Sequence, residues 1–324
     1  MLRGTVPALL LFAIVTAHAA DGRTPVWQPV TITEPGAYYV ARDITGSGVI
    51  VEIAASGVDL DLAGHTLTTD AGGTAIHAQG PYDVSIHDGV VVAGWIGIEL
   101  QRVGNARLER VDVRGAPVLW GIVVGSASAA IVRDCRATTA PGSGTGLAVT
   151  GASPAIVARN VVVAPDATGL SMSGGGAARV EDNVARCTGF HECLFVDTEA
   201  SLVTGNAATG EGPAAIWVAE YDRATANNAG GAVRCLETSV STTMGDIVLE
   251  ENVARNCYEG IQVGMQRVLL VGNLTASNAD GLLFDAFAAD DLLRLNVSRN
   301  NSSADLFCVG ACTSAGDNFV PTLF

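Results

Sequence analysis

The chain of 324 residues contains no lysine, so arginine supplies all 18 of its basic residues against 33 aspartates and glutamates. The resulting formal net charge of −15 argues against nucleic acid and anionic membrane surfaces as partners. It also disfavours polyanionic substrates such as pectate, unless divalent metals bridge the like charges. Partners that are neutral or weakly charged fit this composition best.

Aromatic residues make up only 5% of the chain, although apolar residues as a whole reach 48% and glycines number 38. A core with few rings must be filled by small and branched side chains, which suits strands packed inside a narrow coil. Helical spacing of the apolar residues is missing as well. After residue 20, no run approaches the roughly 20 apolar residues that a membrane-spanning helix needs. The sequence therefore favours strands and disfavours a membrane insertion.

The first twenty residues have the form of a signal peptide. Arg3 gives a positive start, residues 6–15 are apolar, and Ala17, His18 and Ala19 form a small-x-small cleavage site. We therefore expect residues 1–20 to be removed and the protein to be secreted or periplasmic.

The chain has seven cysteines, and in an exported protein they are expected to form disulfides. The odd count leaves Cys135, which we expect to be a buried free thiol. A zinc site is the alternative, but the spacings lack the paired, close-set form that would support it. The disulfide candidates are Cys187, Cys193, Cys235, Cys257, Cys308 and Cys312, of which 187 with 193 and 308 with 312 would close small loops and 235 with 257 lie one repeat apart.

Asparagines recur almost regularly in the second half of the chain, with a mean step of (296 − 160)/6, or about 22.7 residues. A fixed period in this range indicates a stacked repeat architecture. We expect each asparagine to occupy a tight corner in a left-handed conformation, with its amide bonded to the turns on either side. The predicted ladder is Asn160, Asn183, Asn206, Asn228, Asn252, Asn273 and Asn296.

A second strand follows in each turn, and its alternation predicts one buried and one outward face. Short strands between glycine, asparagine, aspartate and serine corners, in turns of about 23 residues, indicate a parallel β-helix of about eleven coils. We expect an N-terminal cap over residues 21–57, the β-helix over 58–302 and a C-terminal cap over 303–324. The predicted inward column is Ile76, Ile98, Ile122, Leu147, Leu170, Leu194, Ile216, Leu236, Ile261 and Leu282.

Two early segments, residues 34–44 (EPGAYYVARDI) and 58–67 (VDLDLAGHTL), resemble the opening of right-handed parallel β-helix proteins of the pectin-lyase-like superfamily. The closest likeness is to periplasmic proteins with short β-helix repeats, including those similar to the copper-accessory protein of nitrous oxide reductase. The resemblance extends over about residues 34–301 and implies an all-β, single-stranded, right-handed parallel β-helix. It implies no particular activity, because the superfamily contains lyases, hydrolases, epimerases, adhesins and proteins without known activity.

The catalytic motifs of that superfamily are mostly missing. No cluster has the form of the calcium-binding aspartates of pectate lyases. The pair Asp290-Asp291 lacks the downstream histidine and the lysine that polygalacturonase-like hydrolases carry. Residues Ile86, His87 and Asp88 match only a fragment of the Asp-Pro-His-Asp motif of alginate epimerases.

The outward positions of the second strand become aromatic and acidic between residues 190 and 262. Aromatic rings offer apolar faces to sugars, and carboxylates accept hydrogen bonds from hydroxyls or act as acid and base. We predict Asp197 and Glu237 as a catalytic pair two turns apart, if the protein is an enzyme. The alternative is that the rings cover a patch of strand and the acids simply solvate the face. The predicted substrate-binding residues are Phe195, Trp217, Glu220, Tyr221, Tyr258 and Gln262.

The histidines offer a weaker alternative. His77 and His87 fall on neighbouring early turns, with Asp88 beside His87, and could form a metal or acid–base site. We nevertheless assign no metal ligand and no cofactor, because methionine is scarce and the histidines are not clustered as copper ligands are.

Two functions from different classes follow. The first is an exported β-helix protein that binds a neutral or weakly charged polysaccharide or cell-surface glycan near residues 190–262 and that, if it is an enzyme, cleaves it as a hydrolase or lyase. The second is a structural, adhesive or accessory scaffold without enzymatic activity. A metal-chaperone role, by analogy with the copper-accessory protein, is a third and weaker hypothesis.

Overall fold

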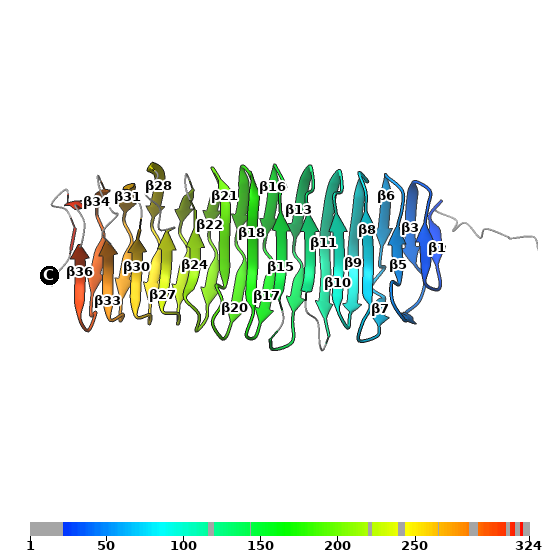
Figure 1. The fold of residues 1–324 in the computed structure, drawn as a ribbon, viewed down its shortest axis with the longest axis horizontal. Helices are drawn as coiled ribbons and strands as arrows, with labels where there is room; N and C mark the ends of the chain where they lie inside the picture. Colours follow the sequence, from blue (N-terminus) through cyan, green and yellow to red (C-terminus); the bar gives the residue numbers. More distant parts are fainter. Residues whose placement is uncertain are drawn as a thin grey trace, which may run out of the picture.

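The computed structural model describes residues 22–115, 120–142, 144–219, 222–238, 244–264, 266–284, 291–308, 312–314 and 318–319. The secondary structure of these residues is entirely β, and the strands stack as a parallel β-helix of about 11 turns (Figure 1). The predicted fold class is confirmed. No helix long and apolar enough to cross a membrane is found in the described ranges. The predicted signal peptide, residues 1–20, lies outside them.

One side of each coil belongs to a sheet of 13 parallel strands. Its strands are β2 (Val30–Ile32), β5 (Val51–Ile53), β8 (Thr74–Gln79), β10 (Ile96–Gln101), β12 (Trp120–Gly125), β15 (Thr145–Thr150), β18 (Thr168–Gly176), β21 (Leu194–Glu199), β24 (Ala214–Val218), β27 (Arg234–Thr238), β30 (Glu259–Val263), β33 (Asp280–Phe284) and β36 (Ala304–Cys308).

The remaining strands form one bent sheet of 24 strands in two rows, joined because β9 and β11 run through both rows. The first row consists of β1 (Thr24–Val26), β3 (Gly36–Val40), β6 (Val58–Asp61), β9 (Val84–Val92), β11 (Asn105–Arg114), β13 (Ala129–Arg133), β16 (Ala155–Ala158), β19 (Ala178–Glu181), β22 (Leu202–Thr204), β25 (Arg223–Thr225), β28 (Met244–Glu250), β31 (Gln266–Val271), β34 (Asp291–Arg294) and β37 (Cys312–Ser314). The second row adds β4 (Ile44–Gly46), β7 (Thr66–Thr69), β14 (Arg136–Thr138), β17 (Val161–Ala164), β20 (Val184–Cys187), β23 (Ala207–Thr209), β26 (Asn228–Gly230), β29 (Val253–Arg255), β32 (Leu274–Ala276) and β35 (Val297–Arg299).

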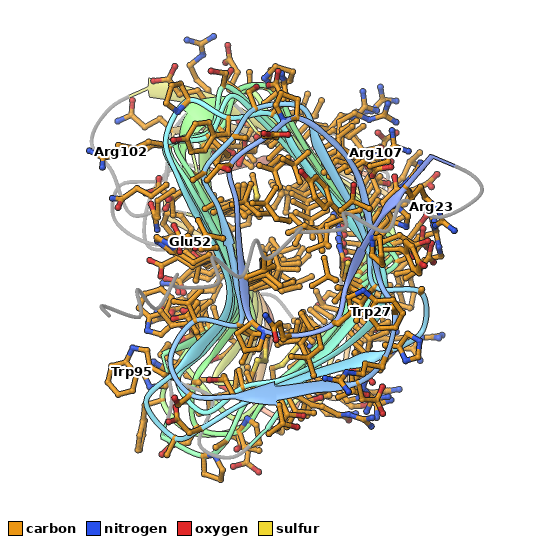
Figure 2. The ribbon with its side chains drawn as sticks, turned by 90° about the vertical axis from the view of Figure 1, so that its right-hand side faces the viewer. Arg23, Trp27, Glu52, Trp95, Arg102 and Arg107 are labelled. Carbon is orange, nitrogen blue, oxygen red and sulfur yellow. A yellow bond between two sulfur atoms is a disulfide. The ribbon has the colours of Figure 1, made fainter. Side chains whose placement is uncertain are left out.

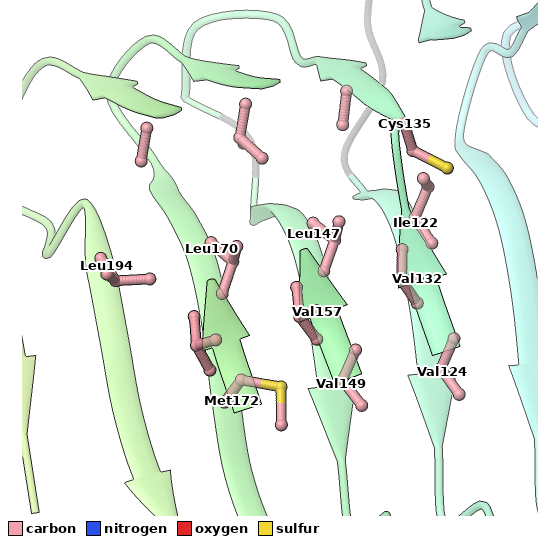
Figure 3. Packing of buried hydrophobic residues seen from close by; sticks show 14 of the residues in the cluster. Ile122, Val124, Val132, Cys135, Leu147, Val149, Val157, Leu170, Met172 and Leu194 are labelled. Atoms are coloured by element: carbon pink, nitrogen blue, oxygen red, sulfur yellow. The ribbon is translucent and has the colours of Figure 1, made fainter. Parts of the chain in front are cut away.

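The predicted inward column of the second strand is confirmed at every predicted position, from Ile76 to Leu282. Register pairs Ile76 with Ile98, then Ile98 with Ile122, and continues in the same way to Leu282. Figure 3 shows part of this packing, with like side chains of successive coils stacked in rows. Because each coil buries its apolar side chains only against its neighbours, the core runs continuously along the axis.

Glycine at the start of several of these strands has a steric cause. A Cβ on Gly97 would lie 2.4 Å from the carbonyl oxygen of Gly121, and a Cβ on Gly121 would lie 2.3 Å from that of Gly146. Each coil therefore approaches the next so closely at this corner that a side chain would clash with backbone.

The asparagine ladder forms as predicted, with one correction. The prediction of Asn228 as a ladder residue is wrong, because Asn227 occupies this place in the ladder and Asn228 is exposed on the outer side of β26. The Oδ1 atom of Asn227 accepts from the backbone N–H and the Nδ2 of Asn206 at 2.9 and 3.0 Å, and its own Nδ2 donates to Asn252 Oδ1 at 3.0 Å and to the Val203 carbonyl at 2.9 Å. The ladder comprises Asn160, Asn183, Asn206, Asn227, Asn252, Asn273, Asn296 and Asn318.

The left-handed conformation lies one residue before the position that the sequence suggests. Arg159, Ala226 and Leu295, each directly before a ladder asparagine, have φ values of 54°. The asparagines themselves are not among the residues with positive φ in the described ranges. Their role is therefore to pair buried polar groups from coil to coil.

Two disulfides and one buried free thiol agree with the sequence prediction. Cys187 is bonded to Cys193 and Cys235 to Cys257, and Cys308 is also disulfide-bonded. Cys135 is free, and burial raises the pKa of its thiol to about 12. Its backbone N–H donates to Asn160 Oδ1 at 2.9 Å, so this residue stands at the beginning of the ladder.

The two terminal segments contribute strands to both sheets. Within residues 21–57, β1 pairs with β3 and β2 with β5, and these strands continue in parallel into β6 and β8. Within residues 303–324, β36 and β37 extend the two sheets, while most of the remaining residues lie outside the described ranges.

Candidate functional site

Four of the predicted site residues form one outward column on the 13-stranded sheet. Register pairs Phe195 of β21 with Trp217 of β24, Trp217 with Glu237 of β27, and Glu237 with Gln262 of β30. Their inward neighbours, such as Leu194, fill the core. A rigid backbone spacing of about 4.8 Å therefore fixes the distance from each of these side chains to the next.

The two aromatic rings stack on each other along the coil axis. The ring centroids of Phe195 and Trp217 lie 4.6 Å apart and the planes differ by 15°. The two facing sides of the rings are therefore in contact with each other and cannot stack on a ligand. On the other side of Phe195 the register places Ser171, whose side chain is too short to cover the ring. The outward column therefore has a step between Ser171 and Phe195, where the small serine leaves one face of the Phe195 ring uncovered.

Glu237 is buried, with 7% of its surface exposed, and it is held by charge. Arg234 Nη1 donates to Glu237 Oε1 at 3.0 Å, and Arg234 Nε donates to Glu259 Oε2 at 3.0 Å. Burial raises the pKa of the Glu237 carboxyl, because removal from water penalises its charged form more than Arg234 stabilises it. A carboxyl with these properties can serve as a hydrogen-bond donor or a proton donor.

Gln262 is also 7% exposed, and its Oε1 lacks a hydrogen-bond partner among the described residues. A buried acceptor that stays unpaired costs about 1–3 kcal/mol. The strand backbone holds Gln262 beside Glu237. A hydroxyl from a bound molecule could donate a hydrogen bond to its Oε1. Gln262 thus differs from the ladder asparagines, whose amides bond to the neighbouring coils.

Asp197 lies on the same face but in a different column from Glu237. Register pairs Asp197 with Ser173, two residues farther along the strand than Phe195. Two strand steps of about 4.8 Å and two residues of about 3.3 Å give a Cα separation of about 12 Å from Glu237. This diagonal is longer than the two-strand step that the sequence suggested.

Of the other predicted substrate-binding residues, Tyr258 is described and does not join this column. Glu220 and Tyr221 lie outside the described residues. Tyr258 is 61% exposed and lies at the corner that precedes β30, four residues before Gln262.

Sequence reasoning missed two residues near the site. Phe190 is 89% exposed on the loop closed by Cys187 and Cys193. A large apolar residue between two closely spaced cysteines was the signal that could have identified it. Arg234 was missed because an arginine in this acidic chain carried no signal of its own before the register placed it beside Glu237.

The expected neighbours His77 and His87 lie on different sheets. His77 on β8 is next to Glu52, with its Nδ1 2.7 Å from Oε2, whereas His87 lies on β9 of the other sheet. Figure 2, viewed along the coils, shows the two sides, with Glu52 opposite Arg107. In the described residues one group of side chains could hold a metal ion, namely Asp61, His87 and Asp88.

The chain matches no protein-family model. It likewise matches no curated protein. Among solved structures it is similar to the A-module of a mannuronan C-5 epimerase from Azotobacter vinelandii, with 12% sequence identity and a TM-score of 0.47 over 93% of this chain and 90% of that chain. At this level the similarity assigns neither a family nor an activity to the chain.

Proposed function

We propose that the chain is an exported β-helix protein that binds a neutral or weakly charged polysaccharide on the outward face of the 13-stranded sheet, around Phe195, Trp217, Glu237 and Gln262. The observation that carries this proposal is the buried Oε1 of Gln262, which lacks a hydrogen-bond partner among the described residues. Gln262 lies next to Glu237, in the same column as the aromatic pair Phe195 and Trp217. Sugars present both an apolar ring face and hydroxyls, and these groups match both features.

The step at Ser171 indicates where a sugar ring would lie. One face of Phe195 is open there, while the hydroxyls of a chain that follows the column would lie over Glu237 and Gln262, of which 7% each is exposed. The net charge of −15 favours a neutral glycan over a polyanion. The two disulfides are typical of an oxidising compartment, which supports export.

Cleavage is a separate and stronger claim. The raised pKa of Glu237 suits a general acid, but an inverting pair needs carboxyl groups about 6.5–9.5 Å apart. Because the backbone separation from Asp197 is about 12 Å, this pair meets that need only if the two side chains lean toward each other. We therefore place binding first and test turnover with the same variants.

A titration with neutral oligosaccharides selected on a glycan array tests the proposal. We expect Trp217→Ala to weaken binding at least about tenfold, and Ser171→Tyr to do the same by filling the step. Trp95→Ala is the matched control, because Trp95 is an exposed tryptophan at 47% outside this column. It should leave the affinity unchanged.

Two outcomes contradict the proposal. If the wild type binds no glycan on the array, or if both site variants bind as well as the control, the protein is better explained as a scaffold. Release of reducing ends from a bound glycan, abolished in Glu237→Gln and in Asp197→Asn, would add catalysis by this pair.

A further inference from the structure

A cluster of metal-binding groups lies on the other sheet, outside the proposed glycan site. Asp61 ends β6, and His87 and Asp88 lie next to each other on β9. His87 Nδ1 is 3.7 Å from Asp61 Oδ1 and 2.8 Å from Asp88 Oδ2, and one ligand atom from each of the three residues lies within 4.8 Å of the others. All three side chains are partly buried, with 20–39% of their surface exposed.

We propose that Asp61, His87 and Asp88 bind a divalent transition-metal ion of the zinc class. Zinc bonds to nitrogen and carboxylate oxygen are about 2.0–2.2 Å long, so tetrahedral ligands lie about 3.3–3.6 Å apart. The distances of 3.7 and 2.8 Å from His87 Nδ1 lie on either side of this range, and side-chain rotations alone would adjust them. Three protein ligands leave a fourth position open.

The second nitrogen of His87 supports this geometry. Nε2 lies 3.2 Å from Asp59 Oδ1, so an N–H on Nε2 can donate to that carboxylate. A histidine that ligates a metal through one nitrogen usually donates from the other to a carboxylate, which fixes its orientation and its tautomer. The contacts of the two imidazole nitrogens are therefore arranged as in a metal-ligating histidine: Nδ1 faces Asp61 and Asp88, and Nε2 faces the supporting carboxylate of Asp59.

The carboxylate ligands are held in place as well. Arg110 contacts Asp88 through Nε and Nη2 at 2.5 and 2.8 Å, and Arg23 Nη1 lies 2.7 Å from Asp61 Oδ2. Asp59, Asp61 and Asp88 carry three negative charges and the two arginines carry two positive charges, so these five groups together have a net charge of −1. A cation is thus compatible with the local charge, although the arginines limit the attraction, and we expect micromolar rather than nanomolar affinity.

The ligand set distinguishes between classes of metal. Calcium and magnesium prefer sets made entirely of oxygen, whereas an imidazole nitrogen suits zinc and its neighbours. A cleft of about 460 Å³ lined by His87, Asp59, Glu109 and Arg107 lies beside the cluster, on the Asp59 side of the imidazole ring.

The same contacts could also belong to a protonated His87 held between carboxylates, and a direct titration separates these explanations. Tag-free protein is titrated with Co²⁺, followed by its visible absorption, and with Zn²⁺ by competition and calorimetry. We expect one ion per chain with tetrahedral Co²⁺ absorption, and no comparable binding of Ca²⁺.

Two variants and one control complete the test. His87→Ala and Asp88→Asn should each weaken Zn²⁺ binding at least about tenfold. Asparagine is chosen at position 88 because φ there is +61° and asparagine tolerates this conformation. His77→Ala is the control, since His77 also lies beside a carboxylate but on the other sheet.

Thermal unfolding in EDTA verifies that each variant is folded. The proposal is overturned if the wild type takes up no stoichiometric Zn²⁺ at about 100 μM, or if His87→Ala and Asp88→Asn both bind like the control. Either result would assign the cluster to ion pairing alone. Glycan binding plays no part in these measurements, so the two proposals stand or fall separately.

Discussion

Two columns of buried polar side chains run along the coils of this molecule, one at the asparagine corner and one on the outward face of the 13-stranded sheet. At the corner, the amide of Asn227 donates to Val203 and Asn252 and accepts twice from Asn206. On the outward face, Gln262 is also buried, but its Oε1 has no hydrogen-bond partner within the described residues.

The contrast separates structural polar groups from candidate functional ones. Repetition allows an amide to bond to the same amide one coil away, so a ladder satisfies itself wherever identical residues stack. Where the residues of a column differ, as from Trp217 to Glu237 to Gln262, no such partner is supplied. A buried atom without a hydrogen-bond partner then lowers the free energy of unfolding, and a ligand that pairs with it could remove this penalty.

Removing one ladder amide should give the largest loss of stability. Asn227→Ala deletes four hydrogen bonds and leaves buried partners unpaired, so we expect the free energy of unfolding to fall by about 3 kcal/mol. Urea unfolding followed by circular dichroism measures the change.

The neighbouring residue provides the control for this measurement. Asn228 is exposed, so Asn228→Ala should change stability by no more than about 0.5 kcal/mol. Equal losses in the two variants would show that the ladder position had been assigned wrongly.

Asp222 is intermediate between the fully hydrogen-bonded Asn227 and Gln262, and its burial leads us to expect a pH-dependent stability. Its Oδ1 accepts from the backbone N–H of Ser201 at 2.8 Å, but its Oδ2 is unpaired within the described residues. Burial raises the pKa of this carboxyl to about 8, with a further contribution from the charge of Asp197.

An acid whose pKa is raised in the folded state stabilises the fold at low pH, and this contribution is lost as the pH rises toward that pKa. Between pH 5.5 and 7 we therefore expect wild-type stability to fall by about 2 kcal/mol relative to Asp222→Asn. Urea midpoints across this range measure the difference. A wild-type slope equal to that of Asp222→Asn, or a slope abolished instead by Asp197→Asn, would contradict the assignment.

The fold could be predicted from the sequence because each coil repeats the same physical problem. The inward column from Ile76 to Leu282 was correct at every position, since alternation along a strand is a local property. Among the predicted ladder positions only Asn228 was wrong, because two adjacent asparagines are compatible with the period and Asn228 fits it slightly better than Asn227. Only the tertiary contacts show that Asn227 bonds to Asn206 and leaves Asn228 outside.

The site was less predictable because it depends on contacts between coils. The column of Phe195, Trp217 and Glu237 follows from the register, and the sequence contained it. The direction in which the rings stack and the position of Arg234 against Glu237 do not follow from spacing. The sequence placed His87 and Asp88 in a possible metal or acid–base site with His77. The contribution of Asp59 and Asp61 was missed for a similar reason, because these residues come from the preceding coil, a full turn earlier in the sequence.

The smallest expected change in stability tests the comparison most sharply. Gln262→Leu removes an amide whose oxygen lacks a hydrogen-bond partner among the described residues and retains a side chain of similar volume. We therefore expect the free energy of unfolding to change by less than about 1 kcal/mol, as a gain rather than a loss. The same variant should weaken glycan binding, because the acceptor for a sugar hydroxyl is gone. A loss as large as that of Asn227→Ala would mean that Gln262 is a structural residue like the ladder amides, and the difference between the two columns would disappear.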